Sequence, residues 1–296
     1  MTQKHLTPHL VNQLDNLYLK AKLIVEGFMS GLHKSPFHGF SIEFSEHRPY
    51  QIGDETKNID WKLWSKTDKY YIKRFEEETN LLCHIFLDSS KSMEFKSNTN
   101  ITKFNYAKIL AAALSYLIIQ QKDALGLYVF DSKIKTTISP KSSKSHLNTV
   151  LSVLEQVKSE HDTNISDILH TGADKIQKKG LIILISDLLD EPKKVVESLK
   201  HFKYNKNEVL VFHIMDEQEI ILDYNDRIMF EDLETKEQIR TNPWQIKESY
   251  KKEVEKYLRY YRTECSLNKI EYNLLLTKDN IEYALSNFLN KRKKSF

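Results

Sequence analysis

One aspartate and two serines in this sequence have the spacing of oxygen ligands for a divalent cation. Asp88, Ser90 and Ser92 occupy alternate positions directly after an apolar run over residues 81–87. Three hard oxygen donors on one short loop suit Mg²⁺, which prefers octahedral oxygen coordination and keeps several waters. An aspartate at the end of a strand can also simply cap the next helix. The hydroxyls two and four positions later favour the cation site.

The elements around this loop predict an open α/β sheet. From residue 80 onward, apolar runs of strand length alternate with stretches of helix length, which indicates parallel βαβ units and a doubly wound, mostly parallel sheet. The expected strands are 81–87, 124–130, 134–138 as an antiparallel edge, 181–185, 209–215 and 270–276; the expected helices are 105–121, 145–157, 165–178, one from about 191, 244–267 and 280–289. Ligands bind such sheets beyond the carboxyl ends of the strands. Asp187, which follows the run 181–185, lies at that edge together with Asp88.

The remaining parts of the chain differ in character. Thr7 and Pro8 have the pattern of a helix start, and apolar residues continue at helical spacing to Ile24. Residues 39–79 interleave aromatic and charged residues and are expected to be irregular and β-rich. We therefore expect three parts: residues 1–79 as a helix plus a small β-rich segment, 80–290 as the α/β domain, and 291–296 as a solvated basic tail.

Composition excludes several classes of protein. The 296 residues include 7 glycines, roughly a third of the usual share of about 7%, and none of them has the spacing of a nucleotide-binding loop. A net charge of +3 is too small for a dedicated nucleic-acid binder. The longest nearly apolar run, 109–119, is too short to cross a bilayer, and two distant cysteines indicate a reducing compartment. We expect a cytoplasmic, soluble protein.

The cation-site residues carry a family resemblance. Asp-x-Ser-x-Ser after a central strand resembles the opening motif of the metal-ion-dependent adhesion site of von Willebrand factor type A domains, and Thr163 and Asp187 match its later parts. The resemblance implies bound Mg²⁺ or Mn²⁺, with Ser90 and Ser92 as direct ligands. It also implies that Thr163 engages or withdraws, and that Asp88 and Asp187 act directly or through water. A sixth position would stay open for a partner's carboxylate.

A second resemblance lies upstream of that motif. The segments that carry it are Glu43-Phe44, Arg48-Pro49-Tyr50, Gly53-Asp54, Ile59-Asp60-Trp61 and Phe75-Glu76-Glu77-Glu78. They are similar to the hallmark of a bacterial family called domain of unknown function 58, and the similarity covers about residues 39–289. Membership would imply a non-enzymatic adaptor or co-chaperone of a MoxR-type AAA+ ATPase, in contact with that ATPase and with its client.

One departure from the type A pattern leaves alternatives open. His161 and Asp162 stand where those domains usually have glycines. Asp162 would either add negative charge to the site, so that the metal needs no partner, or cap the helix that begins near Asn164. A metal-free scaffold is one rival reading. Another is a magnesium-dependent phosphohydrolase, although the haloacid dehalogenase type needs a second aspartate where this chain has Ser90.

Overall fold

The computed structural model describes residues 16–33, 47–49, 61–67, 69–73, 81–97, 101–160, 164–224, 228–231 and 238–294. The chain forms two compact units, one of residues 1–28 with 81–296 and one of residues 29–80. The first helix was expected to group with the segment up to residue 79. Its residues 17–28 belong instead to the larger unit.

The larger unit is built on a six-stranded sheet. Its strands are β3 (Leu82–Asp88), β4 (Ala124–Phe130), β5 (Ile134–Lys141), β6 (Leu181–Ser186), β7 (Glu208–Met215) and β10 (Glu271–Leu276). Their order is β10-β7-β6-β3-β4-β5, and all neighbours are parallel except β5, which pairs antiparallel with β4. The expected doubly wound, mostly parallel sheet with an antiparallel edge strand is confirmed.

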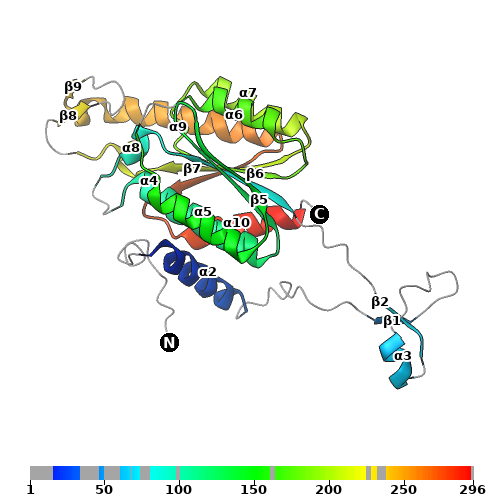
Figure 1. The fold of residues 1–296 in the computed structure, drawn as a ribbon. Helices are drawn as coiled ribbons and strands as arrows, with labels where there is room; N and C mark the ends of the chain where they lie inside the picture. The colour runs from blue at the N-terminus through cyan, green and yellow to red at the C-terminus, as the bar shows by residue number, and fades with distance from the viewer. Residues whose placement is uncertain are drawn as a thin grey trace. The chain divides into compact units, whose positions relative to one another are not determined.

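Helices cover both faces of this sheet (Figure 1). One layer holds α4 (Lys103–Gln120), α5 (Lys144–Gln156) and α10 (Ile281–Lys294), and the other holds α6 (Ile165–Lys175), α7 (Pro192–Tyr204) and α9 (Pro243–Leu267). The start of α2 (Leu17–His33) lies on the α4 and α5 layer, because the Leu17 N–H donates to Glu155 Oε1 at 3.0 Å. The predicted start of this helix at Thr7 lies outside the described residues.

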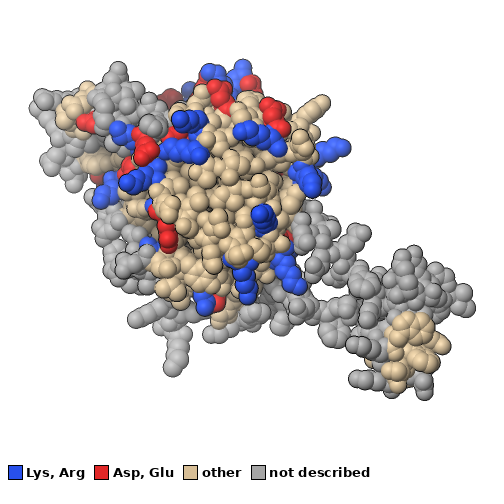
Figure 2. Space-filling model, in the orientation of Figure 1, with Lys and Arg blue, Asp and Glu red and all other residues tan. Residues whose placement is uncertain are grey.

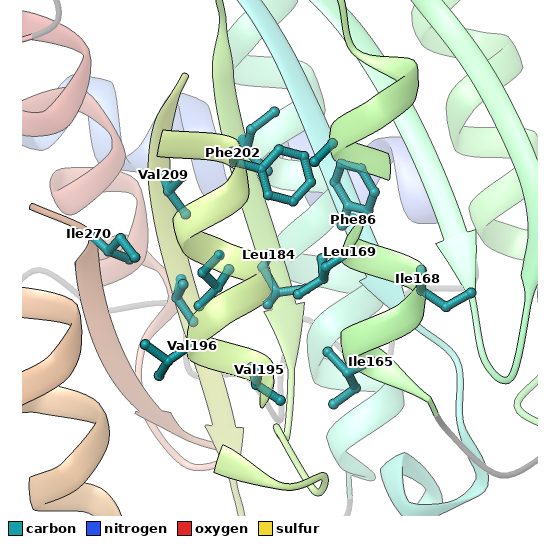
Figure 3. Close-up of a cluster of buried hydrophobic side chains, with 14 of the residues drawn as sticks. Phe86, Ile165, Ile168, Leu169, Leu184, Val195, Val196, Phe202, Val209 and Ile270 are labelled. Carbon is teal, nitrogen blue, oxygen red and sulfur yellow. The ribbon is translucent and has the colours of Figure 1, made fainter. Parts of the chain in front are cut away.

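Buried strands and helices form the core between the sheet and α6 and α7. The strands β4 and β6 are buried along their whole length, which explains their nearly continuous apolar sequences. The Phe86 ring stacks on Tyr128 with centroids 4.4 Å apart (Figure 3 shows Phe86 within the cluster). A Cβ on Gly172 would lie 2.7 Å from the Phe86 ring, so glycine lets α6 pack closely on β3.

Several short elements complete the structure. In the larger unit these are the 3₁₀ helix η2 (Lys91–Glu94), α8 (Gln218–Ile221) and the antiparallel pair β8 (Ile228–Glu231) and β9 (Gln238–Thr241). The smaller unit has α3 (Trp61–Thr67) and the antiparallel pair β1 (His47–Pro49) and β2 (Tyr71–Lys73). The β8–β9 pair was not expected from the sequence, since four-residue strands show too little alternation to be recognised.

The predicted basic tail is wrong for residues 291–294, which continue α10. Lys291 is only 9% exposed and pairs with Glu208 at 2.8 Å. Arg292 Nε donates to Asp123 Oδ2 at 2.6 Å. These cations are part of the helix, and each has a carboxylate opposite it, the partly exposed Glu208 and the buried Asp123.

Charges of both signs share the surface. Figure 2 shows Lys and Arg side chains interspersed with Asp and Glu around the face that it presents. Within the described residues, no helix combines the length and apolarity needed to cross a bilayer.

Candidate functional site at the ends of β3 and β6

The site lies where the order of the strands reverses. The chain runs outward from β3 through β4 to β5, and then returns to β6 on the other side of β3. In open α/β sheets this switch point opens a crevice beyond the carboxyl ends of the strands. Leu87 of β3 pairs with Ile185 of β6, so Asp88 and Asp187 emerge from neighbouring strands. Both side chains are buried, at 0% and 1% exposure.

Asp88 is held by hydrogen bonds from neutral groups. Its Oδ1 accepts from the Ser90 N–H at 2.8 Å, and its Oδ2 accepts from the Ser186 hydroxyl at 2.6 Å. Burial, and next the nearby charge of Asp187, raise the pKa of Asp88 to about 7, against the effect of these hydrogen bonds. Among the described residues, no Lys or Arg forms an ion pair with Asp88. A cation beside Asp88 would stabilise its charged form.

Ser90 and Ser92 present their hydroxyls to each other on the loop after β3. Their Oγ atoms lie 3.0 Å apart, and both residues are buried. Neighbouring ligands of an octahedral Mg²⁺ at 2.0–2.1 Å are also about 3.0 Å apart. Ser90 is the N-cap residue of η2, yet its side chain makes no capping hydrogen bond. The hydroxyl spacing therefore fits two adjacent positions of a magnesium shell.

Asp187 has a cationic partner, Lys103, which was not predicted from the sequence. The ammonium of Lys103 lies 2.9 Å from Asp187 Oδ2 and 2.6 Å from Glu219 Oε1. The Lys103 side chain is 1% exposed. Burial alone would lower the pKa of Lys103, but the two carboxylates outweigh it and raise this pKa. One signal was available: a lysine in the first turn of a helix opposes the helix dipole and so needs a nearby carboxylate.

Ser186 and Leu188 join the two loops. The Ser186 hydroxyl donates to Asp88 and accepts from the Leu188 N–H at 2.9 Å. Leu188 is fully buried with φ at 54°, in the left-handed region that leucine rarely adopts. Its carbonyl accepts from the Tyr257 hydroxyl at 2.7 Å. Strained backbone of this kind persists where surrounding contacts hold it, often at functional sites.

Comparisons with known proteins identify the family of this chain. The family model described as "Protein of unknown function DUF58" matches residues 46–259. The chain belongs to the DUF58 family. It is 23% identical over 232 residues to "Uncharacterized protein Rv1480" of Mycobacterium tuberculosis, an alignment that covers 77% of this chain and 72% of that protein.

Two solved structures are similar to this DUF58 chain at low identity. BatB from Bacteroides thetaiotaomicron, described as a conserved hypothetical protein, shares 18% identity with a TM-score of 0.48, over 72% of this chain and 99% of BatB. The VWA domain of SpRpn10 shares 13% identity with a TM-score of 0.40, over 70% of this chain and 95% of that domain.

The third predicted hydroxyl ligand lies outside the described residues. Thr163 and the two residues before it, His161 and Asp162, fall in that gap. The DUF58 chain resumes at Asn164, whose side chain caps α6 by accepting from the Asp167 N–H at 3.3 Å. Asn164 is therefore the N-cap residue of α6, and both roles considered for Asp162 fall on a residue outside the described range.

The donor set of this DUF58 site consists of hydroxyls and two carboxylates. Within the described residues, no group of three or more His, Cys, Asp or Glu side chains is arranged as metal ligands. The structure brings Asp88, Ser90, Ser92 and Asp187 to one end of the sheet. Oxygen donors without His or Cys suit Mg²⁺ or Mn²⁺ better than zinc or copper.

Proposed function

We propose that this DUF58 protein is a non-enzymatic interaction module that binds Mg²⁺, or Mn²⁺, at the end of β3 and contacts a protein partner through the cation. The observation that supports it best is the pair of Ser90 and Ser92 hydroxyls, 3.0 Å apart beside Asp88. Asp88 is fully buried and has neutral hydrogen-bond donors. A divalent cation would use both hydroxyls and neutralise this carboxylate.

The proposed ligands have distinct roles. Ser90 and Ser92 would bind the cation directly, Asp88 and Asp187 would act directly or through water, and Thr163 would engage or withdraw. An octahedral ion with few charged ligands retains an electrophilic position, which a carboxylate from a partner can fill. Binding of cation and partner would then reinforce each other.

The partner that we propose is a MoxR-type AAA+ ATPase, together with its client. Membership of DUF58 supports this proposal, because the family resemblance in the sequence implies such a partner. The contact surface would be the C-terminal end of the sheet, around Asp88.

Thermal unfolding with Mg²⁺, Mn²⁺ or chelator tests the cation site. Either ion should raise the midpoint of the wild-type protein, and Asp88→Ala should abolish this shift. Asp131→Ala is a matched control, because Asp131 is a fully buried aspartate that follows β4 and pairs with Lys135 at 2.8 Å. It should lower the midpoint and retain the shift. Equal wild-type midpoints with ion and with chelator would refute the cation site.

Capture of a MoxR-type ATPase tests the partner and the surface together. Immobilised wild-type protein should retain the ATPase in Mg²⁺, and both chelator and Asp88→Ala should release it, whereas Asp131→Ala should not. Capture that is indifferent to chelator and to Asp88→Ala would place the contact elsewhere on the chain.

The Lys103–Asp187 ion pair favours a second candidate, a metal-free scaffold. In it, the ammonium of Lys103 would supply the positive charge that a metal ion supplies in the first candidate. This candidate predicts ATPase capture in chelator. A phosphohydrolase would instead release phosphate from generic phosphoesters in Mg²⁺. Turnover that Asp88→Ala abolishes would replace the interaction module with an enzyme.

A further inference from the structure

Lys103 places one fixed positive charge among the carboxylates of the proposed cation site. It begins α4, and its backbone N–H donates to the Phe95 carbonyl at 3.1 Å, on the segment that follows Ser90 and Ser92. Its ammonium is within 2.9 Å of Asp187 and 2.6 Å of Glu219. The same lysine therefore contacts the cation-binding segment through its backbone and a proposed ligand through its side chain.

Glu219 is fixed in place independently of Lys103. Its Oε2 accepts from the Asp216 N–H at 2.7 Å, where β7 ends. Its carbonyl accepts from the Tyr250 hydroxyl at 2.7 Å, which ties α8 to α9. The position of the Glu219 carboxylate is thus set by β7 and α9, and it determines how much of the lysine charge remains for Asp187.

We propose that Lys103 is an internal counter-cation that competes with the divalent ion for Asp187, and that Glu219 sets the strength of this competition. The inference rests on the cation site proposed above. It makes Lys103 a positioning residue, since it acts through Asp187 and not as a ligand. It also explains how two buried aspartates at the end of the sheet coexist when no divalent ion is bound.

The competition predicts changes of affinity in opposite directions for two variants. Lys103→Met keeps a linear apolar stem but removes the charge, so Asp187 becomes available to the ion and binding tightens. Glu219→Gln keeps the shape but removes a negative charge, so the lysine charge acts more strongly on Asp187 and binding weakens. Each change should be on the order of tenfold in Kd, given charges a few ångströms apart in a partly desolvated site. A purely structural role would weaken binding in both variants.

Mn²⁺ titration followed by electron paramagnetic resonance, at fixed pH and ionic strength, measures these affinities in the full chain. Lys103→Arg preserves the charge and should stay within about threefold of wild type. Arg292→Met is the matched control, because it breaks the ion pair with Asp123 at the opposite end of the sheet. It should lower the thermal midpoint and leave the Mn²⁺ affinity unchanged.

The outcomes separate this inference from the proposed function. If the wild-type protein binds Mn²⁺ and Lys103→Met binds it equally or more weakly, the inference is overturned, whereas the cation site is supported. Binding by Lys103→Met but not by wild type supports the inference and refutes the cation-dependent function. Failure of both to bind overturns both. If Lys103→Met does not fold, Glu219→Gln decides, since unchanged or tighter binding by that variant overturns the inference.

Discussion

At the N-terminal end of the sheet, Asp123 is 1% exposed, and both of its carboxylate oxygens accept hydrogen bonds from Arg292, at 2.6 and 3.1 Å. At the C-terminal end, Asp88 is equally buried, and within the described part of the chain it accepts hydrogen bonds only from a hydroxyl and a backbone N–H. Asp123 also accepts from the Leu81 N–H at 3.1 Å, just before β3. The start of β3 thus contacts a neutralised aspartate that precedes β4, whereas its last residue is an aspartate whose charge lacks a cationic partner among the described residues.

The partners of a buried carboxylate decide whether it stabilises the fold or remains able to attract a cation. A buried carboxylate with a direct cation and a backbone donor holds elements together, as Asp123 joins β3, β4 and α10. A buried carboxylate with neutral donors retains attraction for a cation that arrives from outside. Functional sites that retain such a group commonly do so at a cost in stability. The two ends of one sheet should therefore respond in opposite ways to the loss of an aspartate.

The largest effect on stability is expected at the N-terminal end. Asp123→Ala removes the partner of Arg292 and leaves the Leu81 N–H without its acceptor, which should reduce the free energy of unfolding by about 3 kcal/mol. Denaturant unfolding in chelator measures this loss. The midpoint shift in Mg²⁺ that we propose for the wild-type protein should keep its size in this variant. A loss below about 1 kcal/mol would mean that this end of the sheet is no better stabilised than the other.

A second, pH-dependent effect comes from His84, which lies near the start of β3. Burial lowers its pKa to about 4 from 6.5. The folded state therefore binds this proton more weakly than the unfolded state. The contribution of the neutral His84 to stability is fully present well above pH 6.5 and is lost as the pH falls towards 4, by roughly 2.5 kcal/mol at pH 4.5.

His84→Leu tests this contribution. Both ring nitrogens are buried, with no hydrogen-bond partner among the residues that the structure describes, so the variant should be about 1 kcal/mol more stable at pH 7 and should lose less stability on acidification. Urea unfolding between pH 4.5 and 7.5 measures both quantities. An unchanged slope against pH would show that other groups cause the acid lability.

A smaller change in stability is expected at Asp88. Asp88→Asn keeps the shape and removes an uncompensated charge, so in chelator the free energy of unfolding should stay within about 1 kcal/mol of wild type or rise. The same variant should lose the midpoint shift in Mg²⁺. Destabilisation as large as that of Asp123→Ala would mean that the two ends of the sheet have the same structural role.

Most of the sheet could be predicted from the sequence, because each central strand is a continuous apolar run between helices of amphipathic pattern. The strand ends at Asp88 and Ser186-Asp187 followed from those runs. The contacts of Lys103 could not be predicted, since Asp187 and Glu219 lie 84 and 116 residues further along the chain. A charged residue at a helix start shows the need for a partner but not its identity.

The C-terminal end of the chain shows the same limit. Lys291 to Lys294 have the composition of a solvated tail, and only the fold shows that Glu208 and Asp123 stand opposite the first two of them. Sequence patterns locate elements through local periodicity, whereas ion pairs between distant elements leave no local pattern. The strands that lead to the predicted site residues could be recognised from their apolar runs. The pairing of Lys103 with Asp187 could not, because no local pattern encodes it.

The smallest expected effect tests whether Lys291 belongs to the fold. Glu208 pairs with Lys291 at 2.8 Å and retains Lys203 at 3.0 Å, and it is about a third exposed. Lys291→Met should therefore lower the free energy of unfolding by only about 0.5–1 kcal/mol. Lys256→Met is the control, because Lys256 and Glu253 form a pair that is mostly exposed to solvent, and it should change stability by less than about 0.3 kcal/mol. Equal values for the two variants would mean that the Lys291–Glu208 pair contributes no more to stability than an exposed surface pair.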